Sequence, residues 1–232
     1  MKILSDVHQL TIRGVNLILI AEKELTLIDT GFRGSLPVIC RFLERLGRSI
    51  KEISLIIITH NHLDHAGGLP ELMRAAPARV AVHRADLSDT EEGLPYHGIV
   101  RRLLHIPPIT FFRPLVYARP GEVDLKLEGG ETFSPLGGLE VIHTPGHTPG
   151  SISLFAARKQ LLIVGDTLNN RFINLRLPPK NVSSNLKQAV DSVERLARLD
   201  FDTLCLGHGR PILKGAAARV RELLRKRGLS SP

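Results

Sequence analysis

Residues 59–68 constrain this chain more than any other stretch. They read Thr-His-Asn-His-Leu-Asp-His-Ala-Gly-Gly, so three histidines and one aspartate fall within six residues. An apolar, β-branched run over residues 53–58 comes directly before them and predicts a buried strand. Imidazoles and a carboxylate crowded at the end of a strand indicate a metal site.

The spacing of these side chains predicts two metal ions. In an extended segment, alternate side chains point the same way, so His60 and His62 can share one ion and need a third ligand. Asp64 and His65 lie where the chain is expected to turn into a helix, and they can face a second ion. Two-metal sites hold their ions about 3.5–4 Å apart.

The remaining ligands are expected at three distant points. His147 lies in a turn rich in proline and glycine, while Asp166 and His208 follow the apolar runs 161–164 and 203–206. We expect His60, His62 and His147 to bind one ion, Asp64, His65 and His208 to bind the other, and Asp166 to bridge them. Mixed imidazole and carboxylate ligands favour two Zn²⁺ ions, with Fe or Mn as alternatives.

The two halves of the sequence repeat the same order of elements. In each half an apolar strand ends in Asp-Thr, a helix follows, and a second apolar strand ends in a histidine, His60 or His208. Helical spacing of apolar residues recurs over 36–47, 185–199 and 216–227. The chain is therefore expected to be a single α/β domain over residues 1–232, with two β-rich halves and polar residues gathered at strand ends.

Residues 84–126 interrupt this regularity. They hold five prolines and several aromatic residues, and they show no strand rhythm. We interpret them as an insertion that forms either a lid over the site or a surface cover or interface. Substrate contacts are expected from Tyr96 and His97 in this insertion, and from Phe32 and Asn169 in the loops after Asp29 and Asp166.

Five motifs in this order resemble the metallo-β-lactamase superfamily. His60 to His65 match its HxHxDH signature, and Asp29, His147, Asp166 and His208 match its first, third, fourth and fifth motifs. The resemblance implies an αββα sandwich with the metals at one edge, and it implies that Asp29 orients the site without binding metal. The sequences of residues 144–151 and of Gly165 to Leu168 most resemble those of the glyoxalase II-like branch.

The expected chemistry is hydrolysis. A hydroxide held between two metal ions would attack a small ester, thioester or lactone, and Asp64, as metal ligand and catalytic residue, would hydrogen-bond this nucleophile. A phosphodiesterase or nuclease acting on RNA or a small phosphodiester is the alternative. A non-catalytic binding domain is less expected, because such a domain can lose ligands without penalty.

Differences between this sequence and known branches of the superfamily narrow the expected function. Only residues 209–232 follow His208, which disfavours glyoxalase II proper, and no leader suggests a secreted β-lactamase. Residues 167–172 lack the tyrosine of acyl-homoserine lactonases, and residues 167–207 lack the additional histidine of tRNA-processing nucleases. His62 stands where the flavodiiron branch has glutamate.

Charge and composition bear on partners. The formal net charge is +8. From Arg210 onward the sequence has seven basic residues and a single acidic one, Glu222. This excess fits a solvated helix face or attraction of an anionic partner such as RNA, but the chain has no tryptophan and two tyrosines for stacking on bases. We expect a cytoplasmic protein without a membrane span that acts on a small molecule; the oligomeric state is left open.

Overall fold

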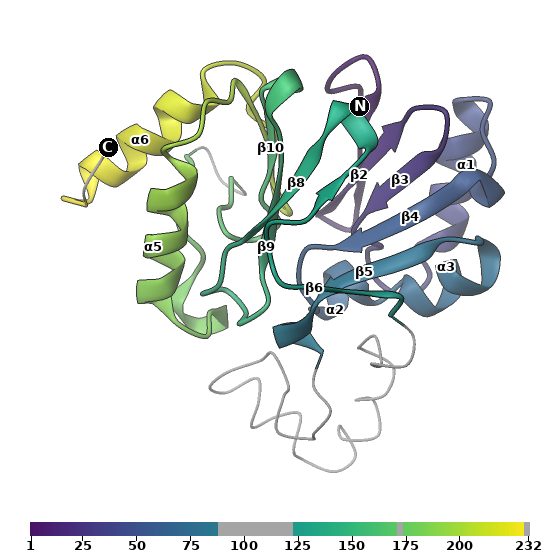
Figure 1. Ribbon diagram of the computed structural model, residues 1–232, viewed down its shortest axis with the longest axis horizontal. Coiled ribbons are helices and arrows are strands. Elements are labelled where there is room, and N and C mark those ends of the chain that lie inside the picture. The colour runs from purple at the N-terminus through teal and green to yellow at the C-terminus, as the bar shows by residue number, and fades with distance from the viewer. Residues whose placement is uncertain (88–122, 171–173, 230–232) are drawn as a thin grey trace, which may run out of the picture.

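The computed structural model describes residues 1–87, 123–170 and 174–229. Two β-sheets face each other in the middle of the molecule, and helices cover the outer face of each (Figure 1). The predicted αββα sandwich with two β-rich halves is thereby confirmed. The first half of the chain builds five strands of one sheet with its helices, and the second half supplies the sixth strand of that sheet and all of the other.

The first sheet has six strands in chain order, β1 to β6. Antiparallel pairing joins β1, β2 and β3, and parallel pairing joins β3, β4, β5 and β6. The bounds are β1 Val7–Ile12, β2 Val15–Ala21, β3 Leu25–Ile28, β4 Ile53–Ile58, β5 Arg79–His83 and β6 Leu125–Leu127. Because β3 and β4 run parallel, the residues that follow them, including Asp29 and His60, reach the same edge of the sheet.

The second sheet has five strands in the order β11-β10-β9-β8-β7. Only β10 and β11 pair in parallel, so their carboxyl ends also meet at one edge. The bounds are β7 Thr132–Phe133, β8 Leu139–His143, β9 Ile152–Ala156, β10 Leu161–Ile163 and β11 Thr203–Cys205. The turn that joins β8 to β9 contains His147.

Helices pack on both outer faces. The first sheet is covered by α1 Leu36–Arg45 and α3 Leu69–Ala75, the second by α5 Leu186–Leu196 and α6 Ala216–Lys226, and α2 Leu63–Ala66 is a single turn after β4. Proline stands in the first turn of α1 and α3, and the Asn185 side chain accepts a hydrogen bond from the Gln188 N–H at the start of α5. Short 3-10 turns are η1 Ile50–Glu52, η2 Arg84–Asp86, η6 Pro135–Gly137, η7 Ala157–Lys159 and η8 Lys180–Val182.

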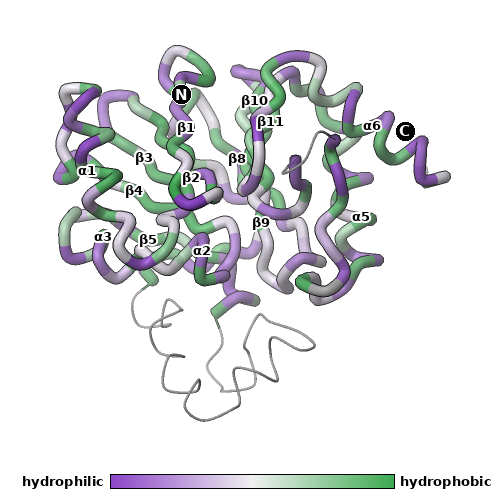
Figure 2. The backbone as a smooth tube through the Cα atoms, turned by 180° about the vertical axis from the view of Figure 1, so that it is seen from behind, coloured by the Kyte–Doolittle hydropathy of each residue, from purple (hydrophilic) through white to green (hydrophobic). Residues whose placement is uncertain are grey.

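Three hydrophobic cores separate the four layers. Alternate residues of β4 show the division, since Ile56 packs toward the helices while Ile57 packs between the sheets. The third core lies between the second sheet and its helices, where Leu162 meets Val193 and Val220. Figure 2 shows the hydrophobic residues concentrated along the central strands. With both faces buried, β4 is apolar at every position except Ser54 and does not alternate.

The structure describes both ends of the predicted insertion. Residues 84–86 form η2, and Leu125 begins β6, which pairs with β5, so regular elements occupy both ends of the 84–126 range. Residues 88–122 lie outside the described residues, and a lid there stays a prediction. Within the described ranges, no helix has the length and apolarity that a membrane span requires.

Candidate metal centre

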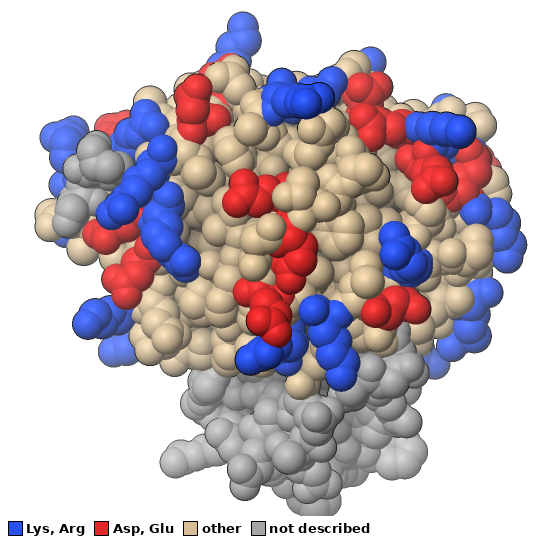
Figure 3. Space-filling view, viewed as in Figure 1, with Lys and Arg blue, Asp and Glu red and all other residues tan. Residues whose placement is uncertain are grey.

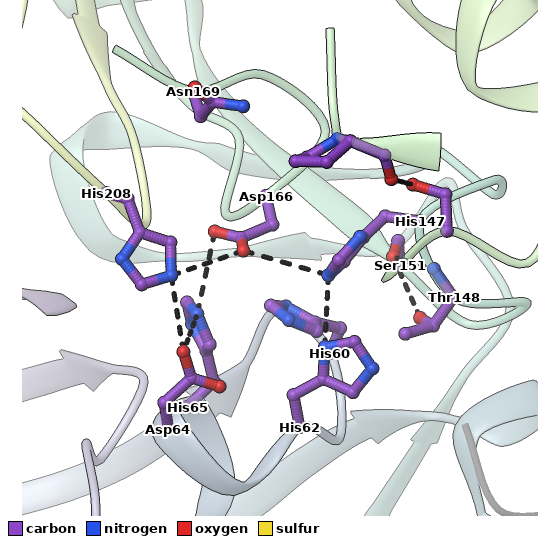
Figure 4. Close-up of polar contacts among 12 residues, drawn as sticks. His60, His62, Asp64, His65, His147, Thr148, Ser151, Asp166, Asn169 and His208 are labelled. Carbon is purple, nitrogen blue, oxygen red and sulfur yellow. Dashed lines mark hydrogen bonds and ion pairs between the residues drawn. The ribbon is translucent and has the colours of Figure 1, made fainter. Parts of the chain in front are cut away.

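Seven polar side chains from four segments converge at one edge of the sandwich (Figure 4). They follow β4, β10 and β11 or lie in the β8–β9 turn, and they are His60, His62, Asp64, His65, His147, Asp166 and His208. Their nitrogen and oxygen atoms form three overlapping groups, each within 4.8 Å. The groups are His60, His62 and His147; His60, His65 and Asp166; and Asp64, His65 and His208. The structure thus brings together every ligand that the sequence predicted.

The first group consists of three buried imidazoles, His60, His62 and His147. Nδ1 of His62 lies 3.0 Å from Nε2 of His147, although 85 residues separate them. Nδ1 of His60 lies 3.1 Å from the Thr59 hydroxyl, which itself contacts both carboxylate oxygens of Asp29. Since a carboxylate only accepts hydrogen bonds, the Thr59 hydroxyl donates to Asp29 and can accept a hydrogen bond from Nδ1–H of His60. This arrangement leaves Nε2 of His60 available to bind a metal ion.

The second group joins carboxylates to imidazoles. Nε2 of His208 lies 3.2 Å from Asp64 and 3.3 Å from Asp166, and Nε2 of His65 lies 3.5 Å from Asp166. Asp166 also lies 3.7 Å from Nε2 of His147, so its carboxylate stands between the two groups. The Nδ1–H of His208 donates to the Gly14 carbonyl at 2.9 Å, which turns Nε2 toward the centre.

Asp29 supports the centre from behind. It follows β3 in a left-handed conformation with φ of 61° and is almost completely buried. Its carboxylate accepts the Thr59 N–H at 2.8 Å and lies 2.8 Å from Nδ1 of His65. This contact places the hydrogen of His65 on Nδ1 and leaves Nε2 free to bind a cation.

Electrostatics divide the centre into two unlike halves. Burial, reinforced by neighbouring imidazoles, lowers the pKa of His60, and it lowers the pKa of His62 to about 3, so both are neutral ligands. Burial also opposes charge on His65 and His208, but the surrounding carboxylates outweigh it and raise their pKa to about 9 and about 10. The second half therefore attracts positive charge strongly.

The donor set fits transition-metal ions. Nε2 of His60, Nε2 of His65 and Oδ1 of Asp166 are buried without a hydrogen-bond partner, and each belongs to one of the ligand groups. Buried polar atoms are rarely left unpaired, and imidazole and carboxylate atoms brought together in this way are typical of zinc, iron or manganese sites. The roles of the individual residues as ligands remain proposals.

Gly207 leaves room for the centre, because a Cβ atom there would collide with Oδ1 of Asp166 and lie 2.7 Å from the His65 ring. We expect Gly207→Ala to lower affinity for metal and kcat by about 10- to 100-fold, as displacement of a ligand's supporting contacts does. Gly215→Ala is the control, since a Cβ there meets no atom within 4 Å and its positive φ strains only the start of α6. Normal metal affinity in Gly207→Ala would contradict the expected role of this glycine.

A cavity of about 420 Å³ opens over the ligands. Phe32 and Asn169 line it as predicted neighbours of the site, while Tyr96 and His97 lie outside the described residues. Its described lining is Arg13, Val15, Phe32, His62, Asp64, His147, Asp166, Asn169, Pro179, Val182 and His208. A larger cavity of about 630 Å³, beside Thr26 and Phe133, contains none of the candidate ligands.

Sequence reasoning missed several residues at this centre. Asn61 was not among the expected site residues, yet its backbone and side chain both donate to Asp86. Thr59 and Asp86 were given no role, although Thr59 contacts Asp29 and His60. The only signal for Asp86 in the sequence was an acidic residue shortly after the end of a strand. Such a residue is also typical of the start of a loop.

The fold and the order of the polar residues agree with one known family. Residues 10–208 match the Metallo-beta-lactamase superfamily. The chain belongs to this superfamily. As a member with a His/Asp cluster able to hold metal, it is a metallo-hydrolase.

Several relatives match this chain over most of their lengths. YobT of Bacillus subtilis is 31% identical over 223 residues, which are 88% of this chain and 86% of YobT. The hydroxyacylglutathione hydrolase GloC of Haemophilus influenzae is 26% identical over 205 residues, 88% of each chain. The solved metallo-β-lactamase family protein TTHA1429 of Thermus thermophilus superposes with a TM-score of 0.70 at 25% identity, covering 98% of this chain and 81% of that one.

Proposed function

We propose that this superfamily member is a dinuclear metal-dependent hydrolase of small esters, thioesters or lactones. The observation that carries the proposal is the pair of ligand groups joined by Asp166 beneath an open cavity. His60, His62 and His147 would hold one ion, and Asp64, His65 and His208 the other. Zn²⁺ is the preferred ion for this donor set.

Water is the proposed nucleophile, because the described lining of the cavity contains no serine, threonine or cysteine. Cys205 is fully buried between the sheets, and burial raises the pKa of its thiol to about 12. Bound metal supplies hydroxide near neutral pH and neutralises negative charge that develops on the substrate. Asp64 is 28% exposed, so its carboxylate can accept a hydrogen bond from the attacking water and orient it.

The proposed substrate class rests on the lining of the cavity and on similarity to the relative GloC. Phe32, Val15 and Val182 give the cavity an apolar wall, and Asn169 adds an amide that can bind a carbonyl or hydroxyl group. The relative GloC is named for hydrolysis of a hydroxyacyl thioester of glutathione, which supports a thioester and the glyoxalase II-like branch. A parallel assay of S-acyl glutathione, lactones, p-nitrophenyl esters and bis-p-nitrophenyl phosphate tests the proposal, and a wide preference for the phosphodiester would overturn it.

A nuclease is less well supported by the surface. Basic side chains are crowded on the side of α5 and α6, but acidic ones are interspersed among them (Figure 3). Arg221 donates to the carbonyls of Ala197 and Leu199 at 3.0 and 3.2 Å, and Lys226 pairs with Glu222. Part of the C-terminal charge therefore serves helix ends and local pairs.

Phe32 is expected to bind substrate without taking part in the reaction. Its half-buried ring lines the cavity, and the Arg13 guanidinium lies 6.0 Å from the ring centre. Phe32→Ala should raise KM about tenfold, which corresponds to about 1.4 kcal/mol of lost apolar contact, with little change in kcat. Phe133→Ala, which alters the other cavity, is the matched control; an unchanged KM in Phe32→Ala would remove Phe32 from the substrate site.

A further inference from the structure

A buried carboxylate behind the metal centre has no role in the proposed chemistry. Asp86 ends η2, is 3% exposed and belongs to none of the three ligand groups. Its Oδ2 accepts the Asn61 N–H at 2.9 Å and the Thr148 hydroxyl at 2.8 Å, and its Oδ1 accepts the Gly150 N–H at 2.6 Å. Its backbone carbonyl accepts the Asn61 amide at 3.0 Å. A buried carboxylate is costly unless it is saturated in this way.

The donors to Asp86 stand directly beside metal-ligand candidates. Asn61 separates His60 from His62, and Thr148 follows His147. These segments come from different sheets, one after β4 and the other between β8 and β9. One carboxylate thus joins the segment that carries two imidazoles to the segment that carries the third. The Ile152 N–H also donates to the Thr59 carbonyl at 2.9 Å, and this second link lies outside the ligand positions.

Gly150 shows how closely Asp86 is seated. A Cβ atom on Gly150 would lie 2.6 Å from the carboxylate carbon of Asp86 and 2.6 Å from its Oδ1. The same Cβ atom would lie 2.6 Å from the backbone nitrogen of Asp86, and the φ of Gly150 lies outside the left-handed region, so the need for glycine here comes from Asp86 and not from the turn. The Thr148 hydroxyl is held further by the Ser151 hydroxyl at 2.8 Å.

We propose that Asp86 is a positioning residue that fixes His60, His62 and His147 relative to one another, and so sets the affinity of that group for its metal ion. This inference rests on the proposed function, since it assigns Asp86 to one half of the proposed dinuclear site. The other half, Asp64, His65 and His208, is oriented by Asp29 and Gly14 and makes no contact with Asp86. Asp29 also reaches His60 through Thr59, so what Asp86 adds is the link of His62 and His147 to that segment.

Asp86→Asn tests the inference with almost no change in volume. An amide offers one carbonyl oxygen, so whichever way it turns, its NH₂ group faces at least one of the Asn61 and Gly150 N–H donors. Zinc titration against a chromophoric chelator should show affinity lowered about 10- to 100-fold for one of two ions, the range found when supporting contacts of a ligand are lost. Cadmium NMR, in which all-imidazole and carboxylate-containing groups give different signals, should show that the all-imidazole group is the one affected.

Further variants keep the test decisive. Gly150→Ala should lower the affinity for the same single ion, because it displaces the carboxylate. Thr148→Val should lower that affinity less, and it replaces Asp86→Asn in the test if Asp86→Asn does not fold. Asp124→Asn is the matched control, because it removes an aspartate hydrogen bond of 2.8 Å to the Val80 N–H, at the opposite end of β5 from Asp86. Equal weakening of both ions, or wild-type affinity in Asp86→Asn and Gly150→Ala, overturns the inference while leaving the dinuclear site intact. A wild-type chain that binds no ion overturns the proposed function itself.

Discussion

Removal of metal should abolish hydrolysis almost completely. We expect a chain dialysed against a strong chelator to lose at least about 1,000-fold in kcat, because water at pH 7 has a pKa far above the value near 7 that it has on zinc. The described lining of the cavity offers no hydroxyl or thiol nucleophile in its place. Addition of two equivalents of Zn²⁺ should restore the activity, and metal analysis of the untreated protein should give close to two ions per chain.

The control for this experiment is the folded state of the metal-free chain. Three hydrophobic cores surround the sheets away from the ligands, so far-ultraviolet circular dichroism should show the same secondary structure before and after chelation. A fully active metal-free preparation would contradict the proposed mechanism. Activity that returns with one equivalent of Zn²⁺ would contradict the dinuclear part of it alone.

The sequence predicted the ligands well because strand ends are local features. Apolar runs such as 53–58 define where a buried strand stops, and parallel pairing of β3 with β4 and of β10 with β11 then brings their carboxyl ends to one edge. This rule places His60 beside Asp29 in one sheet and His208 beside Asp166 in the other, whereas the meeting of the two sheets was expected from the repeated order of elements in the two halves. The αββα layers were expected from the resemblance to the superfamily.

The supporting contacts could not be predicted, because they depend on tertiary distances. Nothing local to Asp86 shows that Gly150 and Thr148 will surround it, since more than 60 residues separate them. The contacts of Asn61 with Asp86 are hidden for the same reason. Strand β7 has two residues and β6 has three, so neither carries a pattern long enough to recognise.

The arrangement of supports explains why the two halves of the centre differ. Asp29 touches His65 directly, and its charge contributes to the raised pKa of that imidazole, whereas Asp86 reaches its histidines only through Asn61 and Thr148. One support therefore adds negative charge to a ligand, and the other fixes position. A neutral three-imidazole group beside a carboxylate-rich group gives the proposed ions unequal environments, which favours polarisation of a substrate between them.

His62→Ala is expected to be the most damaging single substitution of a side chain that spares the fold. His62 is buried, precedes α2 and faces His147 across 3.0 Å, so its loss leaves the first group with two imidazoles. Loss of a supporting contact costs about 10- to 100-fold, and we expect loss of a ligand itself to cost at least about 100- to 1,000-fold in kcat/KM. Bound metal should fall toward one ion per chain.

His8→Ala separates this effect from the general cost of removing a histidine. His8 lies in β1, and its ring packs edge-on against Phe42, 6.0 Å between centres, far from the ligand groups in the fold. It should keep wild-type metal content and turnover. If His62→Ala retains both ions and wild-type kcat/KM, the first ligand group is wrong; if it unfolds where His8→Ala does not, His62→Gln, which keeps a polar side chain, repeats the test. Because His65 and His208 of the second group are held by Asp29 and Gly14, the loss should be confined to one ion.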